Sequence, residues 1–202
     1  MRGASVHAVT TIHLVRHGET DWNRELRWQG HLDPPLNARG REQARALAAS
    51  FADAPIAAVY SSDLQRASDT AEIVAGRLKL AVHVHTSLRE LDVGDWAGQT
   101  LAELRVRYPE PVARWEQTGE RGWTGGESHE AMAARVLEAI RTIAAAHEGG
   151  EVLAVSHGGP IRALRALAAG LDYPRERRSA ARSQNCEVLP IAVEDGTIRR
   201  LD

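Results

Sequence analysis

"TIHLVRHGET", residues 11–20, joins an apolar run to a group of polar side chains. Its first half is rich in Ile, Leu and Val, which is typical of a buried β-strand. The run ends in Arg16 and His17, and a side chain at the end of a strand is held rigidly in one direction. Two interpretations compete: both residues are ordinary polar residues at an exposed strand end, or they begin an anion-binding site.

The chain has 202 residues, of which 43% are hydrophobic and 26% charged. This size and composition predict a single soluble domain over residues 1–202. The formal net charge of −2 favours neither nucleic acid nor an anionic membrane as a partner. Any phosphate binding must therefore come from the local placement of arginine side chains.

The cellular compartment is expected from three features. Cys186 is the only cysteine, so no internal disulfide can form and the residue is expected to be a small buried hydrophobe. The first residues have no continuous apolar region of the kind found in a signal peptide. No apolar run approaches the ~20 residues of a membrane span. We therefore expect a soluble, cytoplasmic protein.

Expected strands and helices alternate along the chain. The strand candidates are residues 11–16, 56–62, 80–85 and 151–157, with amphipathic helices between and after them. This rhythm predicts an α/β fold, a three-layer sandwich with a mainly parallel central sheet and helices on both faces. Two short strands, 187–193 and 197–201, close the chain, and Pro190 places them near a sheet edge.

Residues 94–126 form the least regular part of the sequence. They contain Trp96, Trp115, Trp123 and several arginines, and we expect a helical excursion that covers the site. The tryptophans would suit an organic leaving group with apolar or sugar surface. Substrate choice is expected to depend on this segment and on residues 173–185, where Arg175 to Arg182 either reach the site or form a solvated helix face.

Polar residues recur where the expected strands end. Arg16 and His17 end the first strand, Arg66 lies in the first helical turn after the second, Glu90 follows the third, and His157 ends the fourth. Open α/β sheets bind ligands outside the carboxyl ends of their strands. All five side chains are therefore expected at one edge of the sheet.

These residue types fit phosphate chemistry. Two arginines offer planar, permanently charged donors that match phosphate oxygens. The "HGG" turn at 157–159 leads into a helix whose N-terminal amides favour an anion. Histidine is a nucleophile available near neutral pH, and Glu90 can give or accept a proton. This reasoning leaves open whether His17 or His157 is the nucleophile.

The four motifs in this order resemble those of the histidine phosphatase superfamily, the phosphoglycerate mutase-like family. The resemblance rests on "LVRHGET" at 14–20, Arg66 after "SS", Glu90 ahead of "GDWAG" at 94–98, and "VSHGG" at 155–159. It implies that His17 attacks phosphorus and becomes phosphohistidine, while Arg16, Arg66 and His157 hold the phosphoryl oxygens. Glu90 then protonates the leaving alcohol and deprotonates the attacking water.

The same resemblance implies a wider substrate site. Asn23, Gln29, Gly30 and Gly158 match family positions near the phosphate or the substrate. The partner would be a small phosphomonoester, with no metal ion and no cofactor. The oligomeric state stays open, with a homodimer as one option.

Within this family, the sequence favours hydrolysis of a phosphate ester over the phosphoglycerate mutase reaction. The family's mutases carry a Tyr, a Lys and an arginine pair that grip their substrate, whereas the matching positions here are Val93, Leu101 and Gln117–Thr118. We therefore expect a phosphatase, with a 2,3-bisphosphoglycerate-dependent phosphoglycerate mutase as the alternative. The alternative stays open because three nearby arginines could compensate: Arg105, Arg114 and Arg121.

Two further classes are considered. A serine hydrolase would need a G-x-S-x-G elbow, and the nearest candidate, "GESHE" at 126–130, ends in Glu. A binding module that kept the fold but lost activity would be expected to lack a member of the catalytic set, and here all five residues are present.

Overall fold

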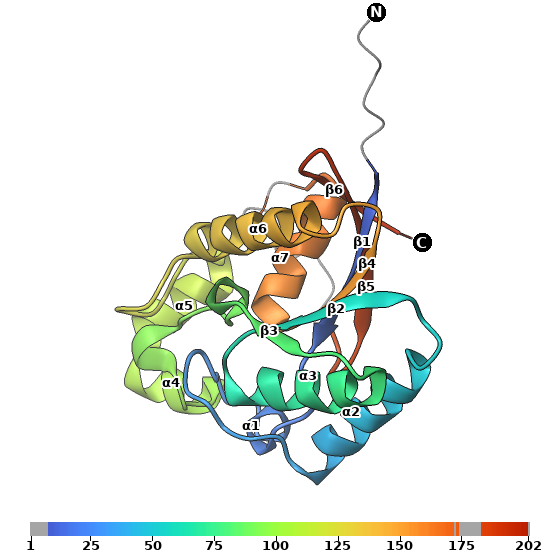
Figure 1. Ribbon diagram of the computed structural model, residues 1–202. Coiled ribbons are helices and arrows are strands. Elements are labelled where there is room, and N and C mark those ends of the chain that lie inside the picture. The colour runs from blue at the N-terminus through green and yellow to red at the C-terminus, as the bar shows by residue number, and fades with distance from the viewer. Residues whose placement is uncertain (1–7, 172, 174–182, 202) are drawn as a thin grey trace, which may run out of the picture.

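The computed structural model describes residues 8–171, 173 and 183–201, and these build an α/β fold around a six-stranded sheet (Figure 1). The strand order is β3-β2-β4-β1-β5-β6. The first four strands in this order pair in parallel. β5 pairs antiparallel with β1, and β6 pairs antiparallel with β5. The predicted fold class is confirmed. The strand bounds are β1 Thr10–Arg16, β2 Ile56–Ser61, β3 Val82–Val84, β4 Glu151–Ser156, β5 Val188–Glu194 and β6 Thr197–Arg200.

Seven α-helices lie in the described residues, and several begin at a residue whose side chain caps the first turn. Asn37 and Ser128 accept hydrogen bonds from backbone amides in the first turns of α2 and α6, as N-cap side chains do. The helix bounds are α1 Asp21–Arg24, α2 Ala38–Ser50, α3 Gln65–Leu78, α4 Leu101–Arg107, α5 Pro109–Thr118, α6 His129–Ala145 and α7 Gly158–Ala168. None of these helices has the length and apolar character to cross a membrane.

The sheet is covered on both faces, which gives the three predicted layers. Figure 1 shows α2 and α3 on one face and α6 and α7 on the other. The side chains of β4 alternate between two cores: Val152 and Ala154 join the α6 and α7 side, while Leu153 and Val155 join the α2 and α3 side. A strand that is apolar on both faces is typical of the interior of a parallel sheet.

The edges of the sheet differ from expectation in one detail. The strand expected over residues 80–85 is shorter, Val82–Val84, and it pairs with β2 from Val59 to Ser61. At the opposite edge, β5 and β6 are placed as predicted. Pro190 lies in β5 just beyond the last paired residue of β6, so its missing N–H costs no hydrogen bond within the sheet.

The segment 94–126 contains a short 3₁₀ helix, Gly94–Trp96, and the helices α4 and α5, and two of its three tryptophans are buried. Trp96 and Trp123 are buried, and both rings contact Trp28 and each other edge-on or tilted. Trp115 also packs edge-on against Trp28. The expectation that these tryptophans face a leaving group is wrong for Trp96 and Trp123, because they form an aromatic core instead. That the segment covers the site stays a prediction.

The loop after β1 is held against α2 by two glycines. An ideal Cβ on Gly40 would lie 2.1 Å from the carbonyl oxygen of Glu19, and one on Gly18 would lie 2.5 Å from the carbonyl oxygen of Gly40. No side chain can occupy either space without moving backbone. This close approach fixes the residues that directly follow His17.

A pair of glycine substitutions tests this contact. Gly40→Ala is expected to lower the free energy of unfolding by about 1–3 kcal/mol, because the backbone of Glu19 must move. Gly76 lies in α3 with nothing within 4 Å of an added Cβ, so Gly76→Ala is expected to stabilise the protein by about 0.5–1 kcal/mol. Urea unfolding of both variants measures the difference, and equal effects would contradict the close approach.

Candidate active site

Two strand ends place the two predicted histidines side by side. The parallel register of β1 and β4 pairs Arg16 with Ser156, and the amide of His17 donates to the carbonyl oxygen of Ser156 at 3.0 Å. His17 and His157 therefore follow the last paired residues of neighbouring strands. Their ring centroids lie 5.1 Å apart, and both side chains are buried. The sequence prediction that these residues meet at one edge of the sheet agrees with this geometry.

The backbone fixes the tautomer of His17. Its Nδ1 lies 2.7 Å from the carbonyl oxygen of Gly18, and a carbonyl only accepts, so Nδ1 carries the proton and donates. The lone pair then lies on Nε2. The amide of Gly18 donates to the hydroxyl of Thr70, whose hydroxyl donates to the carbonyl oxygen of Arg66, and this chain ties the loop to α3.

Burial and positive charge keep both imidazoles neutral. Burial lowers the pKa of His17 well below its usual value, and the charges of Arg66 and Arg16 lower it further. Burial likewise lowers the pKa of His157, followed by the charge of Arg66. A neutral imidazole with a free lone pair is the form that can attack an electrophile.

Arg66 is buried in the first turn of α3 and is held by a loop that precedes β2. Its Nη2 donates to the carbonyl oxygen of Gly30 and its Nη1 to that of Leu32, both at 2.8 Å, with the carboxylate of Asp33 at 3.4 Å. Burial lowers the pKa of Arg66, and the nearby carboxylates of Glu90 and Asp33 oppose that effect. A guanidinium stays protonated in proteins, so a permanent positive charge lies in the interior.

Arg16 and Glu90 approach the same point from other elements. An ideal Cβ on Gly158 would lie 3.7 Å from the Nε of Arg16 and 3.8 Å from the Oε2 of Glu90. The Nη1 of Arg16 donates to the carbonyl oxygen of Ser183 at 2.7 Å, which fixes its direction. Gly158 is thus the first residue of a helix whose N-terminus lies against both charged groups.

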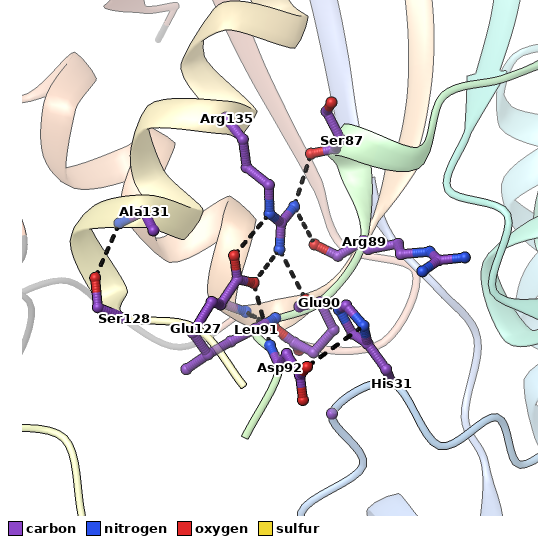
Figure 2. Close-up of polar contacts among 12 residues, drawn as sticks. His31, Ser87, Arg89, Glu90, Leu91, Asp92, Glu127, Ser128, Ala131 and Arg135 are labelled. Atoms are coloured by element: carbon purple, nitrogen blue, oxygen red, sulfur yellow. Dashed lines mark hydrogen bonds and ion pairs between the residues drawn. The ribbon is translucent and has the colours of Figure 1, made fainter. Parts of the chain in front are cut away.

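Glu90 has its carboxylate held by two backbone amides. Its Oε1 accepts from the amide of Leu91 at 2.8 Å and from that of Gly159 at 3.0 Å. Its backbone carbonyl accepts from His31 and from Arg135, which lies on α6 (Figure 2). The carboxylate therefore lies against the N-terminus of α7 with a defined orientation.

Two residues of this site carry buried nitrogens without a hydrogen-bond partner. In the described part of the chain, the Nε of Arg66 and both ring nitrogens of His157 are buried and have no hydrogen-bond partner. Buried polar groups in folded proteins are nearly always hydrogen-bonded. The cationic Arg66 and the neutral His157 each have a buried N–H donor that lacks an acceptor. An anion with several oxygens could accept from both.

Comparison with known sequences agrees with the family that the motifs indicated. The profile of the histidine phosphatase superfamily (branch 1) matches residues 12–201. The chain belongs to the histidine phosphatase superfamily.

Some relatives of this histidine phosphatase are named as mutase-like and others as phosphatases. It is 40% identical over 173 residues to phosphoglycerate mutase-like protein 4 of Arabidopsis thaliana, covering 84% of this chain and 72% of the relative. It is 36% identical over 163 residues to phosphoserine phosphatase 1 of Hydrogenobacter thermophilus, covering 80% and 77%. The solved structure of a mycobacterial glucosyl-3-phosphoglycerate phosphatase in complex with VO3 has a TM-score of 0.84 and 33% identity, covering 96% and 97%.

The remaining predicted site residues of this histidine phosphatase lie around the pocket in supporting positions. The carbonyl of Gly30 holds Arg66, and its positive φ of 52° is a conformation that glycine adopts readily. Asn23 lies in α1, where its Oδ1 accepts from the backbone amide of Thr20 and from the side-chain amide of Asn185, which also donates to the carbonyl oxygen of His17. Gln29 is buried beside Gly30. Contact of Asn23 or Gln29 with a phosphate stays a prediction.

Sequence reasoning missed residues that hold the site without touching its centre. Thr70 could have been found, because it lies one helical turn after Arg66 on α3. Asn185 lies in a segment that was considered only for substrate choice. Arg135 gave no signal, because an arginine on an amphipathic helix is usually solvated. The segment from Arg175 to Arg182 falls outside the described residues.

Two predictions about other chemistry can be compared with the structure. Burial raises the pKa of the Cys186 thiol to about 12, so the thiol stays neutral, as expected for a small hydrophobe. Among residues 8–171, 173 and 183–201, no group of three or more His, Cys, Asp or Glu side chains could hold a metal ion. Metal independence itself stays a prediction.

The lowered histidine pKa values predict a pH-dependent stability. Below about pH 6.5 the unfolded chain protonates His17, whereas the lowered pKa in the folded protein opposes its protonation. The unfolded state then binds more protons, so the free energy of unfolding falls as the pH falls. His17→Gln is expected to make this decline shallower by up to about 1.4 kcal/mol per pH unit. Urea unfolding from pH 7 to 5.5 in phosphate-free buffer measures it, and an unchanged slope would contradict a neutral His17.

Proposed function

We propose that the protein is a phosphomonoester hydrolase that acts without a metal ion, through a phosphohistidine intermediate, on a small phosphorylated metabolite such as a sugar phosphate or a phosphoglycerate derivative. The observation that carries the proposal is the pair of buried histidines beside two arginines, with unsatisfied donors on Arg66 and His157. A phosphate monoester would satisfy these donors and bring its phosphorus next to His17.

The proposed reaction has two steps. In the first, the Nε2 lone pair of His17 forms a bond to phosphorus while the bond from phosphorus to the ester oxygen breaks, and protonated Glu90 gives its proton to the leaving alcohol. In the second, the Glu90 carboxylate takes a proton from water, the resulting hydroxide oxygen bonds to phosphorus, and the P–N bond breaks. Phosphate leaves, and His17 is again neutral.

The two arginines act mainly by neutralising the negative charge of the phosphoryl group. Arg16 and Arg66 neutralise the phosphoryl oxygens as charge shifts between the attacking and leaving groups, and the dry surroundings strengthen that effect. The His157 ring adds a further donor. Because the Arg16 and Arg66 guanidiniums are already held by hydrogen bonds to backbone carbonyls, little reorganisation of these cations accompanies the reaction.

Hydrolysis is favoured over a mutase reaction by the residues around the rim. Val93 is buried in the core and cannot grip a substrate carboxylate. Two of the arginines that could compensate are already engaged: Arg105 pairs with Glu116, and Arg121 donates to the carbonyl oxygen of Trp123. Both observations support water as the acceptor of the phosphoryl group.

Turnover of p-nitrophenyl phosphate in excess chelator tests the proposal. We expect chelator-insensitive hydrolysis, inhibition by vanadate, and loss of both turnover and acid-labile phosphoenzyme in His17→Ala. Chelator-sensitive turnover would contradict the metal-free mechanism. Transfer between phosphoglycerates without hydrolysis of any monoester would favour the mutase, and neither activity would favour an inactive binding module.

Arg66→Ala is expected to reduce kcat/KM for p-nitrophenyl phosphate by about 100- to 1,000-fold, the range found when one donor to a developing charge is removed. The matched control is Arg77→Ala, which removes an arginine from the last turn of the same helix. A loss below about tenfold in Arg66→Ala would place this guanidinium outside the reacting pocket.

A further inference from the structure

Glu90 lies in a segment without regular secondary structure, so its backbone must be held by other means. It follows the short 3₁₀ helix Thr86–Leu88 and precedes a loop that leads to Gly94. A segment with no ladder or helix partners leaves its carbonyl groups to be satisfied by side chains.

The backbone carbonyl oxygens from Ser87 to Glu90 accept hydrogen bonds from side chains of other elements. The hydroxyl of Ser156, at the end of β4, donates to the carbonyl oxygen of Leu88 at 2.7 Å. The carbonyl oxygen of Glu90 accepts from the Nε2 of His31 at 2.9 Å. Arg135 donates to three carbonyl oxygens of the segment at once, and it shares that of Glu90 with His31.

Arg135 uses all five of its N–H donors (Figure 2). Its Nη1 donates to the carbonyl oxygens of Ser87 at 2.8 Å and Arg89 at 2.9 Å, and its Nη2 donates to that of Glu90 at 2.8 Å. Its Nε donates to the carboxylate of Glu127 at 2.9 Å, and its Nη2 also pairs with that carboxylate. A flat, rigid fork with every donor engaged fixes the three carbonyls relative to α6.

Glu127 completes the arrangement from the other side. Its Oε1 accepts from the backbone amide of Asp92 at 3.1 Å, so one carboxylate joins Arg135 to the chain beyond Glu90. Both side chains of the pair are largely buried, with 23% of Arg135 and 18% of Glu127 exposed. The segment 87–92 is therefore held on both sides of Glu90 by this pair.

From this geometry we propose that Arg135, oriented by Glu127, is a positioning residue for proton transfer by Glu90; the inference rests on the proposed role of Glu90. The Glu90 carboxylate must lie within hydrogen-bond reach of the ester oxygen, and a displacement of about 1 Å can cost about 100-fold in rate. The backbone carbonyl that Arg135 binds belongs to Glu90 itself, so loss of this contact moves the carboxylate directly.

Leaving-group dependence separates this role from a merely structural one. The variant Arg135→Met keeps an unbranched side chain and removes the guanidinium. Its kcat/KM is measured for p-nitrophenyl phosphate, whose leaving group needs little protonation, and for β-glycerophosphate, whose leaving alcohol needs a proton. We expect the loss to be about 10- to 100-fold greater for β-glycerophosphate, a share of the ~10²–10⁴ that a general acid supplies.

The matched control is Arg141→Met on the same helix. Arg141 donates to the carbonyl oxygen of Gly196, away from the segment 87–92, and this variant is expected to lower kcat/KM equally little for both substrates. In a Glu90→Gln background, Arg135→Met is expected to add less than it costs alone, because the group that it positions is already disabled.

The outcomes distinguish the two proposals. Equal losses on both substrates in Arg135→Met, with a selective loss in Glu90→Gln, would overturn the positioning role and leave the proposed function intact. Equal losses in Glu90→Gln would instead remove Glu90 as the acid and the positioning role of Arg135 with it, while hydrolysis through His17 would be judged by the His17→Ala experiment. If Arg135→Met does not fold, Glu127→Gln gives the same test, with a smaller selective loss supporting the role and an equal loss overturning it.

Discussion

The parallel pairing of β1 with β4 is the constraint on which the site depends. Its register ends both strands at the same level, so His17 and His157 emerge as neighbours with ring centroids 5.1 Å apart. Both strands lie in the interior of the sheet and contribute to both cores, β4 with two residues on each face and β1 with Ile12 and Leu14 on one face and Val15 on the other, so they cannot shift without disturbing two cores at once. The position of the histidines is therefore as rigid as the hydrophobic core.

Burying positive charge beside these histidines is costly, and the structure offsets the cost with backbone carbonyls. Arg66 and Arg135 each donate to carbonyl oxygens of irregular segments, the first at Gly30 and Leu32, the second around Glu90. In both cases the guanidinium gains hydrogen bonds to backbone carbonyls and one loop is fixed. The arginines that organise the site thus define the shape of the loops that bear its other groups.

Apolar periodicity and the positions of the strand ends were enough to predict the elements of the fold and the residues that meet at the sheet edge. The alternating strands and helices, the three layers, and the meeting of Arg16, His17, Arg66, Glu90 and His157 follow from apolar patterns and from where parallel strands end. Contacts between distant irregular segments do not follow from such patterns. The tryptophan core and the link from Arg135 to Glu90 depend on how loops pack, and one arginine on a helix face looks like any solvated arginine.

In the proposed mechanism the Nε2 of His17 attacks phosphorus, because Nδ1 donates its proton to the carbonyl oxygen of Gly18. The most direct test is NMR of the phosphoenzyme, trapped after rapid mixing with p-nitrophenyl phosphate, with ¹⁵N-labelled histidine and ³¹P detection. The account predicts one-bond coupling between phosphorus and the Nε2 of His17. Phosphorus on Nδ1, on His157, or on no histidine at all would contradict it.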